Sequence, residues 1–393
     1  MTRSRTVIVA GAGVGGLTAA LALAGKGFRV VVLEQAERLE EIGAGLQLSP
    51  NATRILAALG LNDRLAAAVV APEALRVRTY RGRDIVRMPL GPFAQRRYGA
   101  PYWVAHRGDL QAALAGAVGA NPDITLRLGA RAEDYALHAK GVTVQVRTAQ
   151  GADDEHGIAL IGADGLWSML RPRLGDQRPA RFVHRTAWRA MLPAKPLVPE
   201  FREPVVSLWL GPDAHLVLYP VKAGDAVNLV AIVNDEWHQP GWSAAGMPEE
   251  LLAHFSRWPP RVRNLLALPD RWGKWALYDR PRLRRWGTGP VTLLGDAAHP
   301  MLPALAQGAA MAIEDAYVLA DCLARMPDQP VRALRRYERQ RRRRTARVQR
   351  VARWNSRVYH LKGVAAFLRN RALRSRGGQG LLRRYDWLYG WRP

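Results

Sequence analysis

Three glycines near the start of the chain constrain its fold more than any other feature. They are spaced as G-x-G-x-x-G and are Gly11, Gly13 and Gly16. A β-branched run at 6–10 precedes them, and an alanine-rich segment with helical character follows at 17–24. This context is typical of a strand, a tight turn and a helix whose backbone N–H groups approach a pyrophosphate. The same glycines would interrupt a membrane-spanning helix, so we predict neither a signal peptide nor a membrane span here.

A second apolar strand completes this βαβ unit. It covers Arg29 to Leu33 and ends at Glu34, about 20 residues beyond the first glycine, where the acid of a dinucleotide site is expected. A carboxylate there accepts hydrogen bonds from ribose hydroxyls, whereas a basic residue would suit a 2′-phosphate. The unit therefore favours FAD or NAD over NADP, and it does not distinguish FAD from NAD.

The composition indicates a globular chain. Its 393 residues are 48% hydrophobic, which is enough for about two or three packed domains. The single cysteine, Cys322, can form no internal disulfide and no cysteine-based metal or iron–sulfur site. We therefore expect a fold held together by burial alone, no metal centre, and a cytoplasmic location, with which a free thiol is compatible.

The net charge of +25 is concentrated in one predicted helix near the C-terminus. Ten arginines lie there with Glu338 as the only acid among them: Arg335, Arg336, Arg339, Arg341, Arg342, Arg343, Arg344, Arg347, Arg350 and Arg353. We interpret the run as a solvated helix. Nucleic-acid binding would need interleaved aromatics, and the run offers only its flanking Tyr337 and Trp354, which argues against it. Contact with an anionic membrane surface stays open.

The order of the predicted elements indicates an α/β protein in which a sheet-rich domain interrupts a Rossmann-type domain. Residues 205–233 contain three strand-like runs separated by turn residues, which is typical of an antiparallel meander. We expect the dinucleotide-binding domain to comprise residues 1–72, 100–180 and 285–330. A β-sheet substrate domain would comprise 73–99 and 181–284, and a basic helical segment would cover 331–393.

Two further motifs lie where predicted strands end. They are Ile161-Gly162-Ala163-Asp164-Gly165 and Leu294-Gly295-Asp296-Ala297-Ala298-His299-Pro300. With the N-terminal glycines they resemble the ordered motifs of the class A flavoprotein aromatic hydroxylases, the group of para-hydroxybenzoate, salicylate and 3-hydroxybenzoate hydroxylases. The resemblance extends to about residue 325. It implies FAD as the cofactor, with Asp164 and Asp296 in its binding site.

The resemblance also implies the reaction. NADH or NADPH reduces the flavin, O2 adds to form a C4a-hydroperoxide, and the distal oxygen attacks an electron-rich carbon of a small aromatic substrate such as a hydroxybenzoate or salicylate. The chain has no second G-x-G-x-x-G fingerprint. We therefore expect the pyridine nucleotide to bind transiently at the surface.

Several other residues are expected to contact the flavin. Asp296 closes a strand opposite a predicted helix, where its carboxylate can bind ribityl hydroxyls. The N-terminus of that helix, at Gly308 and Ala309, would stabilise the negative charge of reduced flavin. The resemblance implies a contact from Arg107, for which a surface arginine capping a helix is the alternative. We interpret His299 as a structural part of its turn.

Alternation along one strand predicts the substrate-binding residues. His215, Val217 and Tyr219 point to the same face, with the imidazole and the phenol about 13 Å apart along the strand. In relatives within the resembling family, a histidine and a tyrosine with this spacing line the substrate pocket, and a flat ring could rest on Val217. The role we assign to His215 is to accept the proton of the substrate phenol or to stabilise the phenolate. A buried histidine satisfied by backbone groups is the alternative.

Gln47, Gln307 and Ala304 limit which aromatic ring is expected as the substrate. The resemblance places Gln47 where the flavin ring borders the pocket, and the amide of Gln307 beside the substrate. Hydroxynicotinate hydroxylases have histidine at the positions of Gln47 and Ala304. That departure favours a benzoate-like ring over a pyridine.

Two other functions stay open. An epoxidase, a urate-type hydroxylase or a tailoring oxygenase of the same fold would act on a larger ring, for which Ala304 leaves room. A flavoprotein tethered to nucleic acid or lipid by its arginine helix would belong to another class. The tail from Asn355 to Pro393 carries no pattern that we can assign, and the sequence does not distinguish a monomer from a homodimer.

Overall fold

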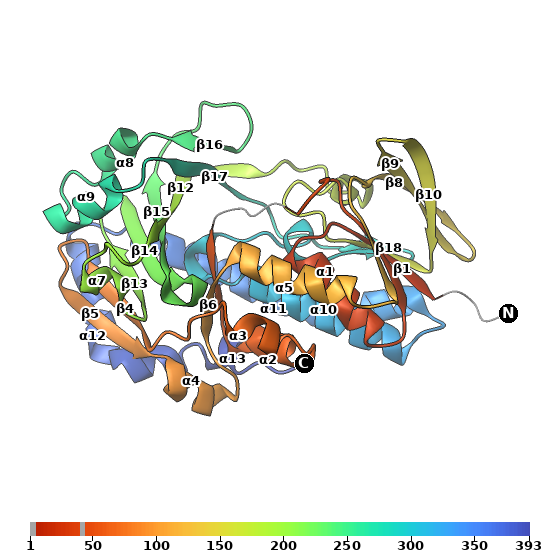
Figure 1. The fold of residues 1–393 in the computed structure, drawn as a ribbon, viewed down its shortest axis with the longest axis horizontal. Helices are drawn as coiled ribbons and strands as arrows, with labels where there is room; N and C mark the ends of the chain where they lie inside the picture. Colours follow the sequence, from red (N-terminus) through yellow and green to blue (C-terminus); the bar gives the residue numbers. More distant parts are fainter. Residues whose placement is uncertain (1–4, 40–43) are drawn as a thin grey trace.

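Two large β-sheets organise the chain, one towards each end of its long axis (Figure 1). The computed structural model describes residues 5–39 and 44–393. Helices between and around the sheets complete an α/β fold, which confirms the predicted fold class. Of the helices described, none combines the length and the apolar character that crossing a membrane requires.

The six-stranded sheet carries the glycine motif. Its strands are, in spatial order, β18 (Gly287–Thr288), β19 (Val291–Leu293), β11 (Ala159–Gly162), β1 (Thr6–Ala10), β2 (Arg29–Leu33) and β7 (Ile124–Arg127). β1 pairs in parallel with β2 on one side and with β11 on the other, and β11 pairs in parallel with β19. Because the carboxyl ends of parallel strands meet at one edge of a sheet, the turns after β1, β11 and β19 converge there.

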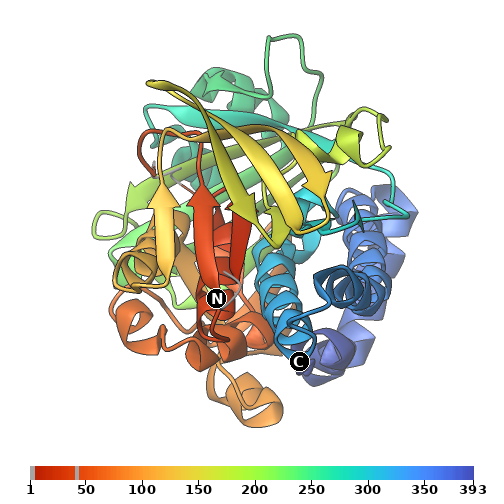
Figure 2. The same ribbon diagram turned by 90° about the vertical axis from the view of Figure 1, so that its right-hand side faces the viewer.

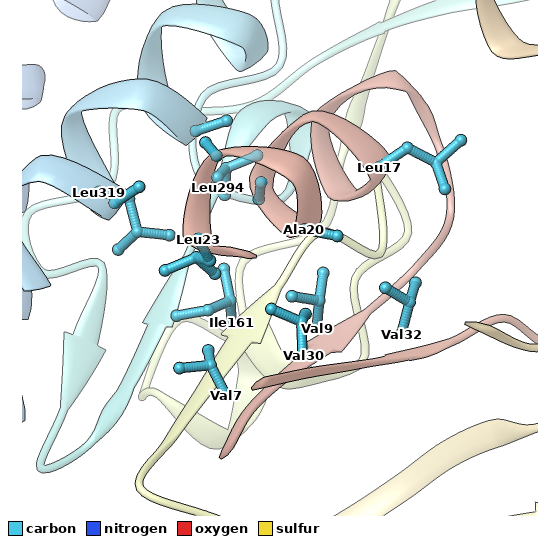
Figure 3. Packing of buried hydrophobic residues seen from close by; sticks show 14 of the residues in the cluster. Val7, Val9, Leu17, Ala20, Leu23, Val30, Val32, Ile161, Leu294 and Leu319 are labelled. Atoms are coloured by element: carbon cyan, nitrogen blue, oxygen red, sulfur yellow. The ribbon is translucent and has the colours of Figure 1, made fainter. Parts of the chain in front are cut away.

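Helix α1 (Val14–Ala24) packs on one face of this sheet. Its side chains lie over Val7 and Val9 of β1 (Figure 3). On its other sides, α1 contacts α5 (Arg107–Gly119) and α10 (Gly308–Arg325). α1 is buried nearly all round, so its sequence is apolar except for Thr18, whose hydroxyl donates to the carbonyl oxygen of Val14, and it shows no amphipathic pattern.

A three-stranded antiparallel sheet covers the opposite face. Its strands are β10 (Gly151–Gly157), β9 (Gly141–Thr148) and β8 (Arg131–His138). Val142 and Val144 of β9 belong to the same core as Ile8. Ile8 alternates with Val7 and Val9 along β1, so it points away from α1 and towards this small sheet.

The eight-stranded sheet is the second of the two large sheets. Its order is β16 (Ser243–Gly246), β17 (Trp272–Asp279), β12 (Arg181–Pro193), β15 (Ala226–Asn234), β14 (Ala214–Val221), β13 (Val205–Leu210), β4 (Ala74–Thr79) and β5 (Asp84–Pro89). β13 pairs in parallel with β4, and the other neighbours are antiparallel. The pairing of β13, β14 and β15 confirms the meander predicted over 205–233.

The two faces of this sheet have different partners. Leu216 and Leu218 of β14 belong to a core with residues of α8 (Pro248–His254) and α9 (Pro260–Ala267). His215, Val217 and Tyr219 alternate with them and line a cavity on the opposite face. The structure thus places the three residues on one face, as the alternation predicts.

Shorter elements connect the sheets. They are α2 (Pro50–Ala58), α3 (Asn62–Ala66), α4 (Gly91–Tyr98), α6 (Leu170–Arg173), α7 (Pro199–Arg202), the two-stranded pair β3 (Gly45–Leu48) and β6 (Trp103–His106), and the 3₁₀ turns η1 (Lys222–Gly224), η2 (Gly295–Ala297) and η3 (Pro303–Leu305). The β3–β6 pair matters most for the site, because β3 carries Gln47 and β6 leads directly into Arg107.

The C-terminal part forms α11 (Pro330–Tyr359), α12 (Gly363–Arg383) and α13 (Asp386–Tyr389). These helices lie along one side of the molecule (Figure 2, blue), where α11 contacts α10 and α12 contacts β5. The aromatic tail, which the sequence left unassigned, packs here. The rings of Trp387 and Trp391 lie against arginines of α11, with the guanidinium of Arg347 3.9 Å from the ring centre of Trp387.

The interpretation of the arginine run as a solvated helix holds for the outer face of α11 and is wrong for its inner face. Arg336, Arg339, Arg343, Arg347 and Arg350 are exposed. In contrast, the side chain of Arg341 is 1% exposed and forms ion pairs with two buried acids of α10, at 2.6 Å in each case. The run therefore contains both a surface stripe and a buried electrostatic contact, which a count of charges does not separate.

Candidate active site

A cavity of about 850 Å³ lies between the two sheets. At one end it is lined by Gly13 and Asp296, from the converging turns of the six-stranded sheet. At the other end it is lined by His215 and Tyr219, from the eight-stranded sheet. A dinucleotide bound at the first end and a small ring bound at the second would therefore share one continuous cavity.

The glycine turn is shaped to leave its backbone accessible. At Gly11, φ is +108°, and a Cβ there would be 2.5 Å from the carbonyl oxygen of Ala163. A Cβ on Gly16 would be 1.9 Å from the carbonyl oxygen of Gly11. Gly13, at the N-terminus of α1, has open space at the corresponding position and lines the cavity. Close packing therefore explains two of the three glycines, and an approaching phosphate explains the third.

Glu34 lies at the end of β2, beside this turn. Its carboxylate accepts a hydrogen bond from the backbone N–H of Ala12 at 2.7 Å and another from Ala36 at 3.0 Å. These contacts fix the carboxylate next to the phosphate-binding turn. The predicted ribose contact would use its remaining lone pairs.

Asp164 stabilises the turn that follows β11 through hydrogen bonds. Its Oδ2 accepts from the backbone N–H groups of Met169 at 2.9 Å and Leu170 at 3.3 Å, whereas its Oδ1 is buried and has no partner among the residues described. Burial raises the pKa of this carboxyl. Its neighbours Ala163 and Gly165 line the cavity. Asp164 itself is not among the described residues that line the cavity, so it holds the turn in place, and its predicted contact with FAD stays a prediction.

Asp296 lies in η2, directly after β19, and is accessible through the cavity. The protein around it nevertheless raises the pKa of its carboxyl by desolvation, against the opposing charges of His299 and Arg107. Arg107 begins α5 and also lines the cavity. His299 is buried and bonded through Nε2 to Asp315, which agrees with the structural role assigned to it.

The N-terminus of α10 faces the same cavity through Gly308 and Ala309. Gln307 precedes it and is 1% exposed. The Gln307 amide donates to Ser49 Oγ at 2.8 Å and accepts from Asn51 Nδ2 at 3.2 Å. These bonds hold the residue in place at the wall of the cavity. The amide nitrogen also donates to the carbonyl oxygen of Ala306 at 3.3 Å, so the residue predicted to contact the substrate has three protein partners.

Gln47 and Gly45 connect β3 to the substrate side. Gln47 lines the cavity and accepts a hydrogen bond from the hydroxyl of Tyr102 at 2.7 Å. The backbone N–H of Gly45 donates to Asn228 Oδ1 at 2.7 Å. A Cβ on Gly45 would be 2.7 Å from the ring of Tyr219, so only glycine allows this close approach between the two parts of the site.

His215 forms a hydrogen-bonded chain that the sequence did not reveal. Its Nδ1 lies 2.6 Å from Nε2 of His360, and Nδ1 of His360 lies 3.0 Å from Oδ1 of Asn234. The Asn234 amide is oriented by Arg185, which donates to the same oxygen, and by Asp213, which accepts from its nitrogen. The backbone-satisfied histidine considered as the alternative is therefore wrong, because the partner of His215 is a second imidazole.

These contacts assign the protons. Because Asn234 presents an oxygen, Nδ1 of His360 carries a proton and its Nε2 is an acceptor. His215 then donates through Nδ1, which leaves a lone pair on its Nε2, and this atom has no partner among the described residues. Burial lowers the pKa of His215 well below its usual range and that of His360 to about 3, so both rings are neutral at pH 7.

Tyr219 completes the polar groups on this face of the sheet. Burial raises its pKa, and the positive charge of Arg189 acts in the opposite direction. Its hydroxyl is therefore protonated at neutral pH and is available as a donor. Arg189 itself lines the cavity from β12 and was not singled out in the sequence. Neither Arg189 nor His360 lies in a local motif, since each reaches the site through long-range pairing.

Comparisons with known proteins agree with this geometry. A family model described as "FAD binding domain" matches residues 4–352. The 3-amino-4-hydroxybenzoate 2-monooxygenase PtnB3 of Streptomyces platensis is 39% identical over 392 residues, covering 99% of this chain and 96% of that protein. The 3-hydroxybenzoate 6-hydroxylase 1 of Aquipseudomonas alcaligenes is 40% identical over 390 residues, with 98% and 97% covered. The crystal structure of Klebsiella pneumoniae HpxO with FAD and uric acid superposes with a TM-score of 0.86 at 26% identity, covering 99% of this chain and 97% of that one.

Proposed function

The chain belongs to the class A flavoprotein aromatic hydroxylases, which are FAD-dependent monooxygenases, and we propose that its substrate is a phenol carrying a carboxylate, of the hydroxybenzoate class. One observation carries this proposal: a single cavity runs from the glycine turn at Gly13 to the sheet face that bears His215 and Tyr219. The names of two relatives, which specify hydroxybenzoates as substrates, support the same class.

The residues present fit FAD. The turn at Gly13 and the N-terminus of α1 would hold the pyrophosphate, Glu34 a ribose, and Asp296 the ribityl hydroxyls. The N-terminus of α10, at Gly308, would lie at the flavin, with Gln47 and Arg107 on other walls of the cavity. Bound FAD supplies electron transfer from NADH or NADPH and the activation of O2. The protein supplies binding, orientation and exclusion of water.

His215 would accept a hydrogen bond from the substrate phenol through Nε2. A phenol of pKa near 10 needs about 4 kcal/mol to ionise at pH 7, at 1.36 kcal/mol per unit. The hydrogen bond from Nδ1–H to His360 holds the Nε2 lone pair in position. The acceptor therefore needs no reorganisation, and this supplies part of the free energy needed to ionise the phenol. Desolvation is the main cause that lowers the pKa of His215, and a phenolate beside the ring would raise that pKa.

Tyr219 and Gln307 would orient the ring. The phenol of Tyr219 donates from the opposite end of the same strand face, and the buried amide of Gln307 fixes the wall next to the start of α10. Between His215 and Tyr219 the face is aliphatic, with Val217 and Val230 lining the cavity. This arrangement suits a flat ring with polar substituents at its edges.

A substrate panel tests the proposal. We expect the FAD-loaded protein to oxidise NADH or NADPH faster in the presence of a hydroxybenzoate, an aminohydroxybenzoate or salicylate, and to release a hydroxylated product identified by chromatography. His215→Ala should reduce hydroxylation far more than NADH oxidation. Turnover of uric acid or a larger ring in place of every benzoate would contradict the substrate class, and equal losses of both activities in His215→Ala would contradict the role of the imidazole.

A further inference from the structure

Arg189 occupies a defined position on the substrate face of the eight-stranded sheet. On β12 it pairs with Val230 of β15, which in turn pairs with Val217 of β14. Residues that pair directly in an antiparallel sheet share a face, so the three side chains form one row across it. This row lies halfway between the rows of His215 and Tyr219. By the usual strand spacing, the Cα of Arg189 is about 10 Å from that of Val217.

The guanidinium of Arg189 lacks an anionic partner. No hydrogen bond or ion pair to it is formed within residues 5–39 and 44–393, and its described contact is with the ring of Trp275, 5.0 Å away. Burial lowers its pKa, and the charge of Arg107 acts in the same direction. The group nevertheless stays protonated at neutral pH, as arginine does in proteins. The Arg189 side chain is part-exposed to the cavity, and a partly desolvated cation without a partner is stabilised when a ligand supplies the opposite charge.

Trp275 orients this cation. Gly273 lies directly opposite Arg189 in the pairing of β12 with β17. A Cβ on Gly273 would be 2.3 Å from the Trp275 ring, so the indole lies over the glycine and beside the arginine. A guanidinium against an aromatic ring keeps its planar edge free for a bidentate partner, and carboxylate is the group that matches this fork.

The charge of the cavity favours an anion at this point. Among the described residues, the lining contains five arginines and a single acidic side chain: Arg107, Arg189, Arg369, Arg376, Arg384 and Asp296. The charge of Arg107 acts on Asp296, Arg369 and Arg376 lie on α12, and Arg384 directly follows the end of that helix. Arg189 is therefore the cation of the substrate face, on the same surface as the imidazole and the phenol.

We propose that Arg189 binds the carboxylate of the aromatic substrate and so selects ring acids over neutral phenols. The inference rests on the proposed function, because it names the group of the substrate that Arg189 holds. The ring would lie on the aliphatic row, with its carboxylate at the guanidinium and its hydroxyl at Nε2 of His215. Arg189 would then fix which ring carbon faces the flavin.

A binding experiment tests this without relying on turnover. Benzoate and benzamide have nearly the same shape, and only benzoate is charged. In the FAD-loaded protein, calorimetric titration should show that Arg189→Met weakens benzoate at least about 30-fold, which corresponds to about 2 kcal/mol, the lower end for truncating one partner of a buried charge pair. Benzamide binding should change by less than about threefold, since neutral contacts are retained.

Two further variants serve as controls. Arg189→Lys keeps the charge and loses the fork, so it should weaken benzoate by an intermediate factor. Arg181→Gln removes an exposed charge from the same strand and should leave the ratio of benzoate to benzamide affinity unchanged. Arg189→Met in the ligand-free protein should melt at the same or a higher temperature, because a burial penalty is removed. A structural role predicts a lower melting temperature instead.

The outcomes separate this inference from the proposed function. Equal weakening of both ligands, no weakening, no benzoate binding by the unmodified protein, or loss of FAD from Arg189→Met would each overturn the carboxylate contact. If benzoate binding depends on Arg189 but no hydroxybenzoate is turned over, the proposed substrate class fails and the carboxylate contact stands. If hydroxybenzoates are turned over and Arg189→Met has the same ratio of benzoate to benzamide affinity as the unmodified protein, the carboxylate contact alone fails.

Discussion

Replacing His360 by leucine should disable the imidazole that faces the substrate without touching the cavity-facing atom. His360 accepts the Nδ1–H of His215 at 2.6 Å, and this bond determines which nitrogen of His215 carries the proton. With leucine, the Nδ1–H would be buried and unpaired, since His215 is 2% exposed. Moving the proton to Nε2 removes the unpaired donor at Nδ1, but it replaces the lone pair that faces the phenol with an N–H donor.

The magnitude follows from these two states. An unsatisfied buried donor costs about 1–3 kcal/mol, which favours the unproductive tautomer by roughly 5- to 150-fold. Loss of a positioned base slows a proton-transfer step by about 10²–10⁴-fold. We therefore expect the rate of product formation in His360→Leu to fall by about 10²-fold, with FAD binding unchanged because His360 makes no contact with the glycine turn or Asp296.

His360→Gln is the matched variant. A glutamine oxygen can lie near the position of Nε2 and accept the same Nδ1–H, so this variant should recover most of the lost rate. The assay compares NADH consumed with hydroxylated product released under identical conditions. His360→Leu should still oxidise NADH and should convert less of it into product.

Three results would refute the reasoning. Product formation by His360→Leu within about twofold of the unmodified protein would show that the tautomer of His215 does not matter. Glutamine as damaging as leucine would indicate a packing effect and not a hydrogen-bond effect. A ¹⁵N spectrum showing the His215 proton on Nε2 in the unmodified protein would contradict the assignment itself.

Three other perturbations have defined outcomes. Gly16→Ala brings a Cβ to 1.9 Å from the carbonyl oxygen of Gly11, so the purified protein should be colourless, as absorbance of the flavin at its visible band will show. The pKa values of the paired imidazoles are lowered in the folded protein, that of His360 to about 3, so the unfolded chain binds more protons than the folded protein below pH about 6.5. The melting temperature should therefore fall as the pH is lowered from about 6.5, and it should fall less steeply in His360→Gln, which has one of the two imidazoles. Arg341→Met removes one partner from each of two buried acids, Glu314 and Asp315, which keep Arg344 and His299; it should reduce the free energy of unfolding by about 3 kcal/mol, whereas Arg343→Met on the exposed face should change it by less than about 0.5 kcal/mol in chemical denaturation.

The elements that could be predicted from the sequence depend on local patterns. The glycine spacing gave the βαβ unit because strand, turn and helix are contiguous, and the structure has them at Thr6–Ala10, Val14–Ala24 and Arg29–Leu33. The period of two along β14 placed His215 and Tyr219 on one face for the same reason. Each inference needed no knowledge of what packs against the element.

The features that escaped prediction are set by long-range packing. His360 is 145 positions from His215, and it meets that residue only because α11 ends beside the start of β14, the middle strand of the meander. Arg189 joins the substrate row through strand pairing with β15, which no pattern within β12 specifies. Arg341 differs from Arg343 in its burial and not in its sequence context, since both lie in the same run of arginines. A local pattern fixes the phase of an element but not its neighbours.

The same packing links stability to function in this site. The cavity is lined by two charged groups that have no hydrogen bond or ion pair to the described residues: the guanidinium of Arg189 and the carboxylate of Asp296. Each disfavours the empty state, because desolvation is incompletely compensated. Cofactor hydroxyls that donate to Asp296 and a substrate carboxylate at Arg189 would supply both missing partners. In the FAD-loaded protein, a ring acid should therefore raise the melting temperature more than a neutral phenol does, since only the acid provides the negative charge that the substrate face lacks.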